Sequence, residues 1–396
     1  MKTKSAALFL AASMLLGFIG ILGLSGCADT TYALSVSGTE VKAGEYIYAQ
    51  LEAAQEAVSK FKEENPDTDV SDSAFDYFKQ ELEGKKFTDW VNDSAVDVCR
   101  ERMACAELFD ELGLTLTADD ETEIRNNVES FWANTDIASA GVGNYGTLGE
   151  FFESSGIGKA SLSTVLTYQK KKEKVFHAYF DADGIEAVSE SELRAKMAEE
   201  YARFRAIPIY LSDGEGNAIT SEEGLKEIDG LAQSYVERLS AGESFVVVQN
   251  DYSEYVDSLT PVAEEEETGE TAETTDGEEA AVDAEAEAET DNDYDLAEKK
   301  GSPYYLTETE QEFLFGMDAN TAAVYKGDTY YYVIQRLDIN EREDWFENIS
   351  ESLLHEIKDA TMIEKIRERA DLVNVTLNQA AIKRYKPQTI AKKGIL

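Results

Sequence analysis

Amphipathic helical segments dominate residues 43–204, and this pattern constrains the fold of the chain more than any other feature. Apolar side chains recur there at steps of four and three residues, the spacing of one helical face. The clearest run is Ile47, Leu51, Ala54, Val58 and Phe61. We find no regular alternation of strands with helices, so a doubly wound parallel sheet is not expected. The sequence predicts an α+β fold that is mainly α.

Two sequence signals predict where helices begin. Thr117 with Asp120, and Ser189 with Glu192, have the spacing of capping boxes, in which each side chain satisfies a free backbone N–H group of the first turn. The second box predicts a helix that runs to about Phe204.

Strand signals concentrate after Arg205. Short apolar or β-branched runs bounded by turn residues predict strands; they cover 206–211 and 329–337, and similar short patterns occur at 32–41 and 372–377. Helices are expected between and after them, over 222–240, over 307–315 and from just after Asn340. A compact mixed module is therefore expected near the C-terminal half of the chain.

A strongly acidic tract interrupts this module. The formal net charge of the chain is −44, and residues 264–298 contain seventeen Asp and Glu but no Lys or Arg. With so few aromatic or branched side chains the tract cannot bury enough surface to fold, so residues 262–299 are predicted to be a disordered insert. A calcium site is the alternative, although the tract lacks a recognisable loop pattern with a turn glycine. The overall charge argues against nucleic acid as a partner.

The N-terminus resembles a bacterial lipoprotein signal peptide. Lys2 and Lys4 precede an apolar run over 6–24, and the run ends in Leu-Ser-Gly before Cys27. These last residues are similar to a lipobox, which implies cleavage after residue 26 and a lipid on Cys27. The chain is then expected on the outer face of a bacterial cell membrane, held by its acyl chains. An uncleaved membrane anchor is the alternative.

The other cysteines and the two histidines do not indicate a catalytic centre. Cys99 and Cys105 lie six residues apart on one predicted helix, about 9 Å along its axis, too far for a disulfide. We expect them to be buried thiols. His177 and His355 are far apart in sequence, and each is expected to be a helix-surface or packing residue. No metal or cofactor is predicted.

Four stretches, in order, resemble SurA/PrsA-type extracytoplasmic foldases. They are 37–46 (SGTEVKAGEY), 112–121 (LGLTLTADDE), 239–245 with 251–253 (LSAGESF and DYS), and 331–337 (YYVIQRL). The resemblance implies a discontinuous helical chaperone domain of the trigger-factor/SurA type, formed by 27–204 and 340–396. It also implies an inserted parvulin-like peptidyl-prolyl isomerase domain over 205–339, and C-terminal residues that supply a helix and a strand.

The chain departs from the parvulin pattern at the positions that matter for catalysis. Residues 205–208 read Arg-Ala-Ile-Pro, so Ala206 replaces the usual first histidine, and Tyr332 stands at the second. The glycine-rich loop is reduced to 300–303. Pro208 cannot donate a ladder hydrogen bond, so its strand is predicted to be an edge or to be bulged.

The resemblance implies a membrane-anchored foldase or chaperone for exported proteins, with weak or no isomerase activity. Its partners would be unfolded exported polypeptides, and a homodimer is left open. The candidate peptide-binding residues are Tyr305, Phe313, Phe315 and Tyr332. Three alternatives remain open: an active peptidyl-prolyl isomerase, a solute-binding lipoprotein of a transporter, and a secreted enzyme with a carboxylate pair.

Overall fold

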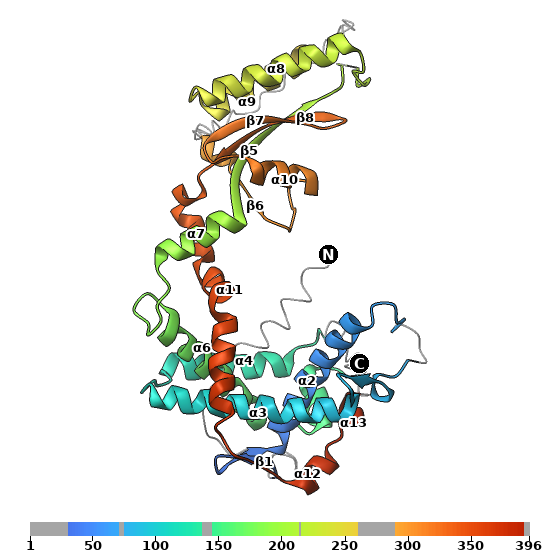
Figure 1. Cartoon of the computed structure of the whole chain (residues 1–396), viewed down its shortest axis with the longest axis vertical. Coiled ribbons are helices and arrows are strands. Elements are labelled where there is room, and N and C mark those ends of the chain that lie inside the picture. Colours follow the sequence, from blue (N-terminus) through green and yellow to red (C-terminus); the bar gives the residue numbers. More distant parts are fainter. Residues whose placement is uncertain (1–30, 71–74, 137–144, 214, 260–289, 392–396) are drawn as a thin grey trace, which may run out of the picture. The chain divides into compact units, whose positions relative to one another are not determined.

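The computed structural model describes residues 31–70, 75–136, 145–213, 215–259 and 290–391. They form two compact units (Figure 1). We call the unit made of the chain up to Val188 and from His355 onward the helical unit, and we call Ser189–Leu354 the sheet unit. The structure is mainly helical with small sheets, which confirms the predicted fold class. The predicted signal peptide, Cys27 and most of the acidic insert lie outside the described residues.

The two units do not divide at the predicted domain limits. Those limits were 204/205 and 339/340, whereas the compact units meet in the chain at 188/189 and 354/355. The assignment of the units to a chaperone domain and a parvulin-like domain stays a prediction. None of the helices in the described part of the chain combines the length and apolar composition that a membrane crossing requires.

Long helices make up most of the helical unit. Its elements in chain order are β1 (Tyr32–Val36), β2 (Thr39–Lys42), α2 (Ala43–Glu64), η1 (Tyr77–Lys79), β3 (Glu81–Leu82), β4 (Lys85–Lys86), α3 (Phe87–Glu111), α4 (Ala118–Ala133), α5 (Leu148–Ser155), α6 (Lys159–Phe180), the residues of α11 (Glu343–Ala370) from His355 onward, β9 (Val375–Leu377), α12 (Gln379–Arg384) and α13 (Pro387–Ala391).

A small antiparallel sheet brings both ends of the described chain into the helical unit. β1 pairs with β2, as predicted for 32–41, and β9 pairs with the other edge of β1, with Leu34 opposite Leu377. Gln50 in α2 donates from Nε2 to the carbonyl oxygen of Tyr385 at 2.9 Å. Segments more than 300 residues apart in sequence therefore share one core.

The predicted cysteine and histidine roles are confirmed within this unit. Cys99 and Cys105 are free and buried, and burial raises the pKa of each thiol to about 12, so neither is a ready nucleophile. His355 stacks on Phe176 with ring centroids 4.1 Å apart, and His177 is half-buried. Both histidines are packing or surface residues.

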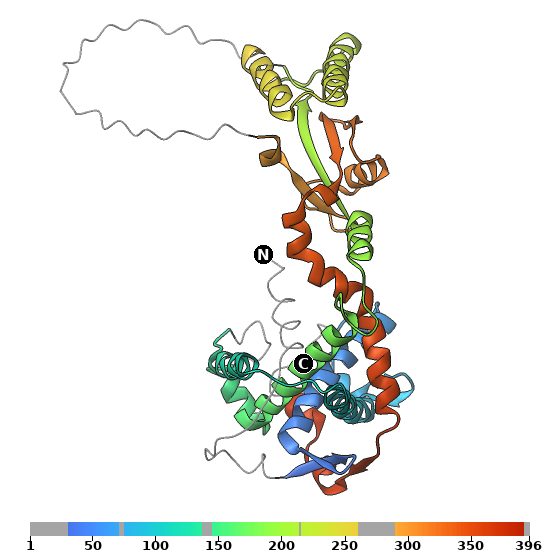
Figure 2. The same cartoon turned by 90° about the vertical axis from the view of Figure 1, so that its left-hand side faces the viewer.

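The sheet unit surrounds a four-stranded sheet. Its elements are α7 (Glu190–Glu200), β5 (Tyr201–Tyr210), α8 (Glu222–Ser240), α9 (Phe245–Leu259), η2 (Asp291–Tyr294), β6 (Leu296–Lys299), α10 (Glu308–Gly316), β7 (Thr321–Lys326), β8 (Tyr330–Leu337), η3 (Ile339–Glu341) and the first residues of α11. The strand order is β6-β5-β8-β7, and every pairing in this sheet is antiparallel. Figures 1 and 2 show α8 and α9 on one face and α10 on the other.

Both predicted capping boxes are present, but the second helix is shorter than expected. Thr117 with Asp120 caps α4, and Ser189 with Glu192 caps α7. α7 ends at Glu200 rather than near Phe204, because the chain turns there into β5. Two elements were not predicted: β7, and the helix α9 that continues beyond the apolar start at Phe245.

The strand that contains Pro208 is central at its start and an edge at its end. β6 pairs only with Tyr201–Phe204, so beyond Phe204 the described residues include no strand on that side of β5. This confirms the prediction of an edge at Pro208. The opposite side of the strand pairs with β8 along its length, with Pro208 opposite Tyr332.

The predicted disordered insert 262–299 is wrong over its last residues. Residues 291–299 form η2 and β6, and Asp295 has no exposed side-chain surface. Its carboxylate accepts hydrogen bonds from three guanidinium groups: Arg203 Nε at 2.9 Å, Arg205 Nε at 2.8 Å and Arg342 Nη1 at 2.8 Å. These ion pairs order an acidic segment whose composition alone indicates disorder.

Loss of the Asp295 charge is predicted to destabilise the sheet unit. In Asp295→Asn the buried guanidinium groups of Arg203 and Arg205 lose their shared counter-charge, which should lower the free energy of unfolding by about 3–5 kcal/mol. Hydrogen exchange of the β5 and β8 amides measures this loss unit by unit. Asp293→Asn is the matched control, since Asp293 only caps the short η2 turn, and it should cost about 1 kcal/mol. Equal losses would show that the buried network adds little.

Candidate functional site

The face of the sheet under α10 contains both positions at which the usual histidines are replaced. Residues directly opposite one another in an antiparallel pair point to the same face. Ala206 lies opposite Ile334, and Tyr332 lies opposite Pro208 on one side and Tyr325 on the other. The register therefore places Ala206 and Tyr332 on one face, which we call the α10 face.

The structure brings four of the five sequence-predicted site residues together. Ala206, Tyr332, Phe313 and Phe315 are all half-buried and pack against one apolar cluster between the sheet and α10. The buried members of this cluster are Ala202, Phe204, Leu306, Leu314 and Ile334. Tyr305 is not part of the cluster. It lies in the turn before α10 and keeps 50% of its surface exposed.

The α10 face is only partly covered. Along β5 the burial falls from Phe204, which is fully buried, through the half-buried Ala206 and Pro208 to Tyr210, which is 57% exposed. Tyr304 in the turn before α10 is 82% exposed. The sequence reasoning missed Tyr210 and Tyr304; the tyrosine pair after Pro303 was a signal for the second.

The turn that presents Tyr304 and Tyr305 is held by a buried carboxylate. Glu298 in β6 has no exposed surface. It accepts hydrogen bonds from the backbone N–H of Tyr304 at 2.6 Å, from that of Tyr305 at 3.1 Å and from Gln311 Nε2 at 3.1 Å. The backbone of both tyrosines is thus fixed while their side chains face water.

A second buried carboxylate ties α10 to β8. Glu310 is 3% exposed, closes the capping box of α10 with Thr307, and accepts a hydrogen bond of 2.6 Å from the Tyr330 hydroxyl. Burial opposes ionisation of Glu310, but the hydrogen bonds from Tyr330 and Thr307 outweigh it and hold the pKa of this carboxyl below its usual value. The same hydrogen bond, with burial, raises the pKa of Tyr330.

Arg336 holds the other end of α10. Its Nη1 donates to the carbonyl oxygen of Phe315 at 3.1 Å and also to that of Met317. A cation at a helix C-terminus satisfies free carbonyl groups and complements the helix dipole. Burial lowers the pKa of Arg336, although an arginine remains charged at neutral pH. Both ends of α10 are therefore fastened to the sheet by polar contacts.

The chemistry available on this face is binding rather than proton transfer. Ala206 has no polar group, and burial raises the pKa of Tyr332, so its phenol stays neutral near pH 7. Among the described residues, no group of three or more His, Cys, Asp or Glu is placed to hold a metal ion. What the face offers is a row of aromatic rings, with Tyr330 and Tyr332 at 4.7 Å and Tyr210 and Tyr330 at 6.3 Å between centroids.

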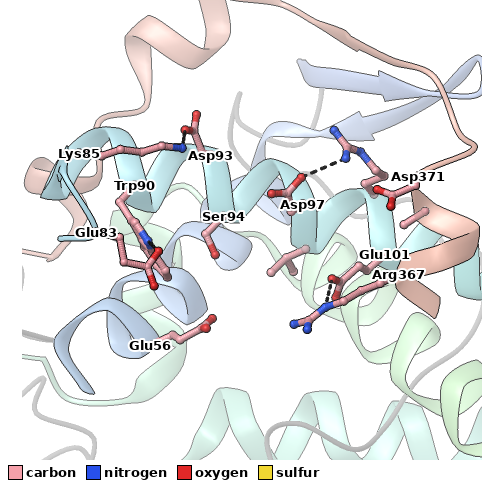
Figure 3. Close-up of a pocket in the computed structure, with 13 residues that line it drawn as sticks. Glu56, Glu83, Lys85, Trp90, Asp93, Ser94, Asp97, Glu101, Arg367 and Asp371 are labelled. Atoms are coloured by element: carbon pink, nitrogen blue, oxygen red, sulfur yellow. Dashed lines mark hydrogen bonds and ion pairs between the residues drawn. The ribbon is translucent and has the colours of Figure 1, made fainter. Parts of the chain in front are cut away.

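The helical unit has a hollow of about 450 Å³ along α3 (Figure 3). Its charges are largely neutralised within the wall: Lys85 pairs with Asp93 at 2.6 Å, and Arg367 with Glu101 at 3.1 Å. A wall of paired, partly exposed charges offers little net attraction for a ligand. The α10 face is the stronger candidate.

No family model matches the chain, and no curated protein matches it. Two solved structures resemble it. Both are PrsA foldases. The PrsA of Streptococcus pneumoniae str. Canada MDR_19A is 14% identical over 79% of this chain and 98% of its own, with a TM-score of 0.27. The PrsA of Bacillus subtilis is 11% identical over 76% and 84%, with a TM-score of 0.20. Likenesses this low do not assign an activity to this chain.

Removal of the Tyr330 hydroxyl is predicted to weaken the attachment of α10 in a pH-dependent way. Tyr330→Phe deletes a hydrogen bond to a buried charged group, which should cost about 1.5–3 kcal/mol of unfolding free energy at pH 7. The lowered pKa of Glu310 contributes stability above the unfolded pKa of about 4.3, and this is lost as the pH falls through the folded value.

The difference between Tyr330→Phe and the parent should therefore shrink on acidification below about pH 4. Urea unfolding at both pH values, with an NMR titration of Glu310, checks this. Tyr331→Phe, on the opposite face of the sheet, is the control. A difference independent of pH would contradict the proposed role of Glu310.

Proposed function

We propose that this chain is a membrane-anchored extracytoplasmic chaperone that holds unfolded segments of exported proteins on the α10 face. The observation that supports it most is the half-covered aromatic face, with Tyr210, Tyr304 and Tyr305 exposed on or beside it. Burial of apolar surface is worth about 25 cal/mol per Å², and aromatic side chains offer much area with few rotatable bonds. Such a surface binds apolar segments without a fixed sequence.

The anchor and the location belong to the same proposal. The lipobox-like end of the apolar N-terminal run supports lipid attachment at Cys27, on the outer face of a bacterial cell membrane. The partners would then be exported polypeptides that emerge unfolded, and the membrane through the lipid. A net charge of −44 disfavours nucleic acid, and it keeps a binding surface of this kind soluble.

The geometry favours holding over isomerisation. Rotation about an X-Pro bond has a barrier of about 18–20 kcal/mol, and an enzyme must stabilise the twisted amide with polar groups placed around it. Ala206 and Tyr332 stand where the parvulin resemblance implies histidines, and neither supplies a group that titrates near neutral pH. We therefore propose weak or no isomerase activity.

A solute-binding role in transport is less favoured. Proteins of that kind are expected to contain wound parallel sheets with helices on both faces. In the described residues every strand pair is antiparallel.

Removal of the exposed tyrosines is predicted to abolish client holding without loss of folding. Residues 28–396 contain both compact units whole, so a lipid-free form suits an assay of aggregation suppression with a chemically unfolded client. The triple variant Tyr210→Ser, Tyr304→Ser, Tyr305→Ser should bind the client at least about tenfold more weakly, equivalent to about 1.4 kcal/mol. Circular dichroism of the variant should match the parent, because the three side chains are largely exposed.

The double variant Ile185→Ser, Leu372→Ser is the matched control, since these side chains are 61% and 75% exposed in the helical unit. It should suppress aggregation as the parent does. A triple variant that keeps full activity would sink the proposal. A protease-coupled assay on a prolyl peptide, run in parallel, should show little acceleration, and a rate lost in Tyr332→Phe would instead favour the isomerase.

A further inference from the structure

A second, smaller hollow in the helical unit combines an apolar wall with basic side chains. It measures about 190 Å³ and lies between α3, α6 and the residues of α11 that belong to this unit. Val98, Tyr168, Ile363 and Ile366 supply the apolar wall, and Arg102 and Lys172 supply positive charge. This hollow takes no part in the function proposed for the α10 face.

Arg102 has an unused hydrogen-bond donor at this hollow. Its side chain is only 12% exposed, and its Nη2 donates to Glu52 at 2.6 Å. The neighbouring Nη1 atom is buried and has no hydrogen-bond partner among the described residues. A buried donor left unpaired costs about 1–3 kcal/mol, more on a charged group, so an acceptor at this position would be strongly stabilising.

Lys172 is a second cation without a partner. Its neighbours in α6, Lys170, Lys171 and Lys174, each pair with a carboxylate. Lys172 is exposed and forms no ion pair with any residue that the structure describes. In a chain with 80 acidic and 36 basic side chains, an unpaired lysine beside a half-used arginine marks a local positive site.

The acidic side chains of the hollow do not fill this role. Glu52 is engaged by Arg102 through Nη2, and Glu101 is paired with Arg367 at 3.1 Å. Neither reaches Nη1 of Arg102 or the ammonium group of Lys172 within hydrogen-bond distance. An external carboxylate could accept from both cations at once, which is the arrangement that arginine favours.

We propose that this hollow binds a monocarboxylate with a compact apolar tail. The carboxylate would accept from Arg102 Nη1 and Lys172 Nζ, and the tail would lie against Val98, Ile363 and Ile366. The volume equals that of about six liquid waters, which limits the tail to a few carbon atoms. Two sources share this chemistry: the C-terminal residue of a polypeptide with an aliphatic side chain, and a short fatty acid.

Binding of N-acetyl-leucine to residues 28–396 tests the proposal by saturation-transfer NMR and thermal shift. N-acetyl-leucine amide, which lacks the negative charge, should bind at least tenfold more weakly. Hexanoate separates the sources: binding of N-acetyl-leucine alone supports a polypeptide C-terminus, and binding of hexanoate supports a fatty acid. No binding of either carboxylate, or equal binding of acid and amide, would overturn the proposal.

Lys172→Met should weaken carboxylate binding by about tenfold and leave the fold intact, because Lys172 is exposed and unpaired. Lys62→Met is the matched control: Lys62 is an exposed lysine of α2 that does not line the hollow. Glu52→Gln removes the competitor for the Arg102 guanidinium and should tighten binding. An equal loss in Lys62→Met and Lys172→Met would contradict a specific site.

Discussion

The antiparallel register between β5 and β8 is the constraint on which the candidate site depends. Eight consecutive residue pairs, from Arg203 opposite Leu337 to Tyr210 opposite Tyr330, assign alternate side chains to opposite faces. Ile207, Ile209 and Val333 face the α8 and α9 side, and Ala206 and Tyr332 face α10. A slip of one residue would exchange these sets. Burial of the aliphatic set under α8 therefore also determines which aromatic rings remain half-open under α10.

Buried ion pairs hold this register at the start of β5. Arg203 and Arg205 point away from α10, and Asp295 pairs with both. Asp291, four residues earlier, bonds to Arg205 and accepts from the backbone N–H of Phe245 and Val246 at the start of α9. An acidic segment after the tract thus connects a strand with a helix more than 40 residues earlier in sequence. Charge that reads as a solvating tract is, at its end, structural.

Local signals in the sequence predicted the helices well and the long-range contacts poorly. Capping boxes at Thr117 and Ser189 and the strand at 329–337 depend on neighbours in sequence, and the structure confirms them. The early end of α7 and the order of η2 and β6 depend on Arg203 meeting Asp295, which no local pattern shows. Ala206, Tyr332, Phe313 and Phe315 were identified through family resemblance, and the sheet brings them together. Tyr210 and Tyr304 were missed because exposure is decided by what α10 leaves uncovered.

The central claim is that unfolded chains contact the sheet unit at the open part of the α10 face. Site-specific photocrosslinking tests it directly, with benzoylphenylalanine in place of Tyr304, which is 82% exposed, or in place of Leu372, which is 75% exposed in the helical unit. The account predicts that an unfolded client crosslinks efficiently from position 304 and only weakly from position 372. Efficient crosslinking from 372 with none from 304, while aggregation is still suppressed, would place client binding elsewhere and contradict the account.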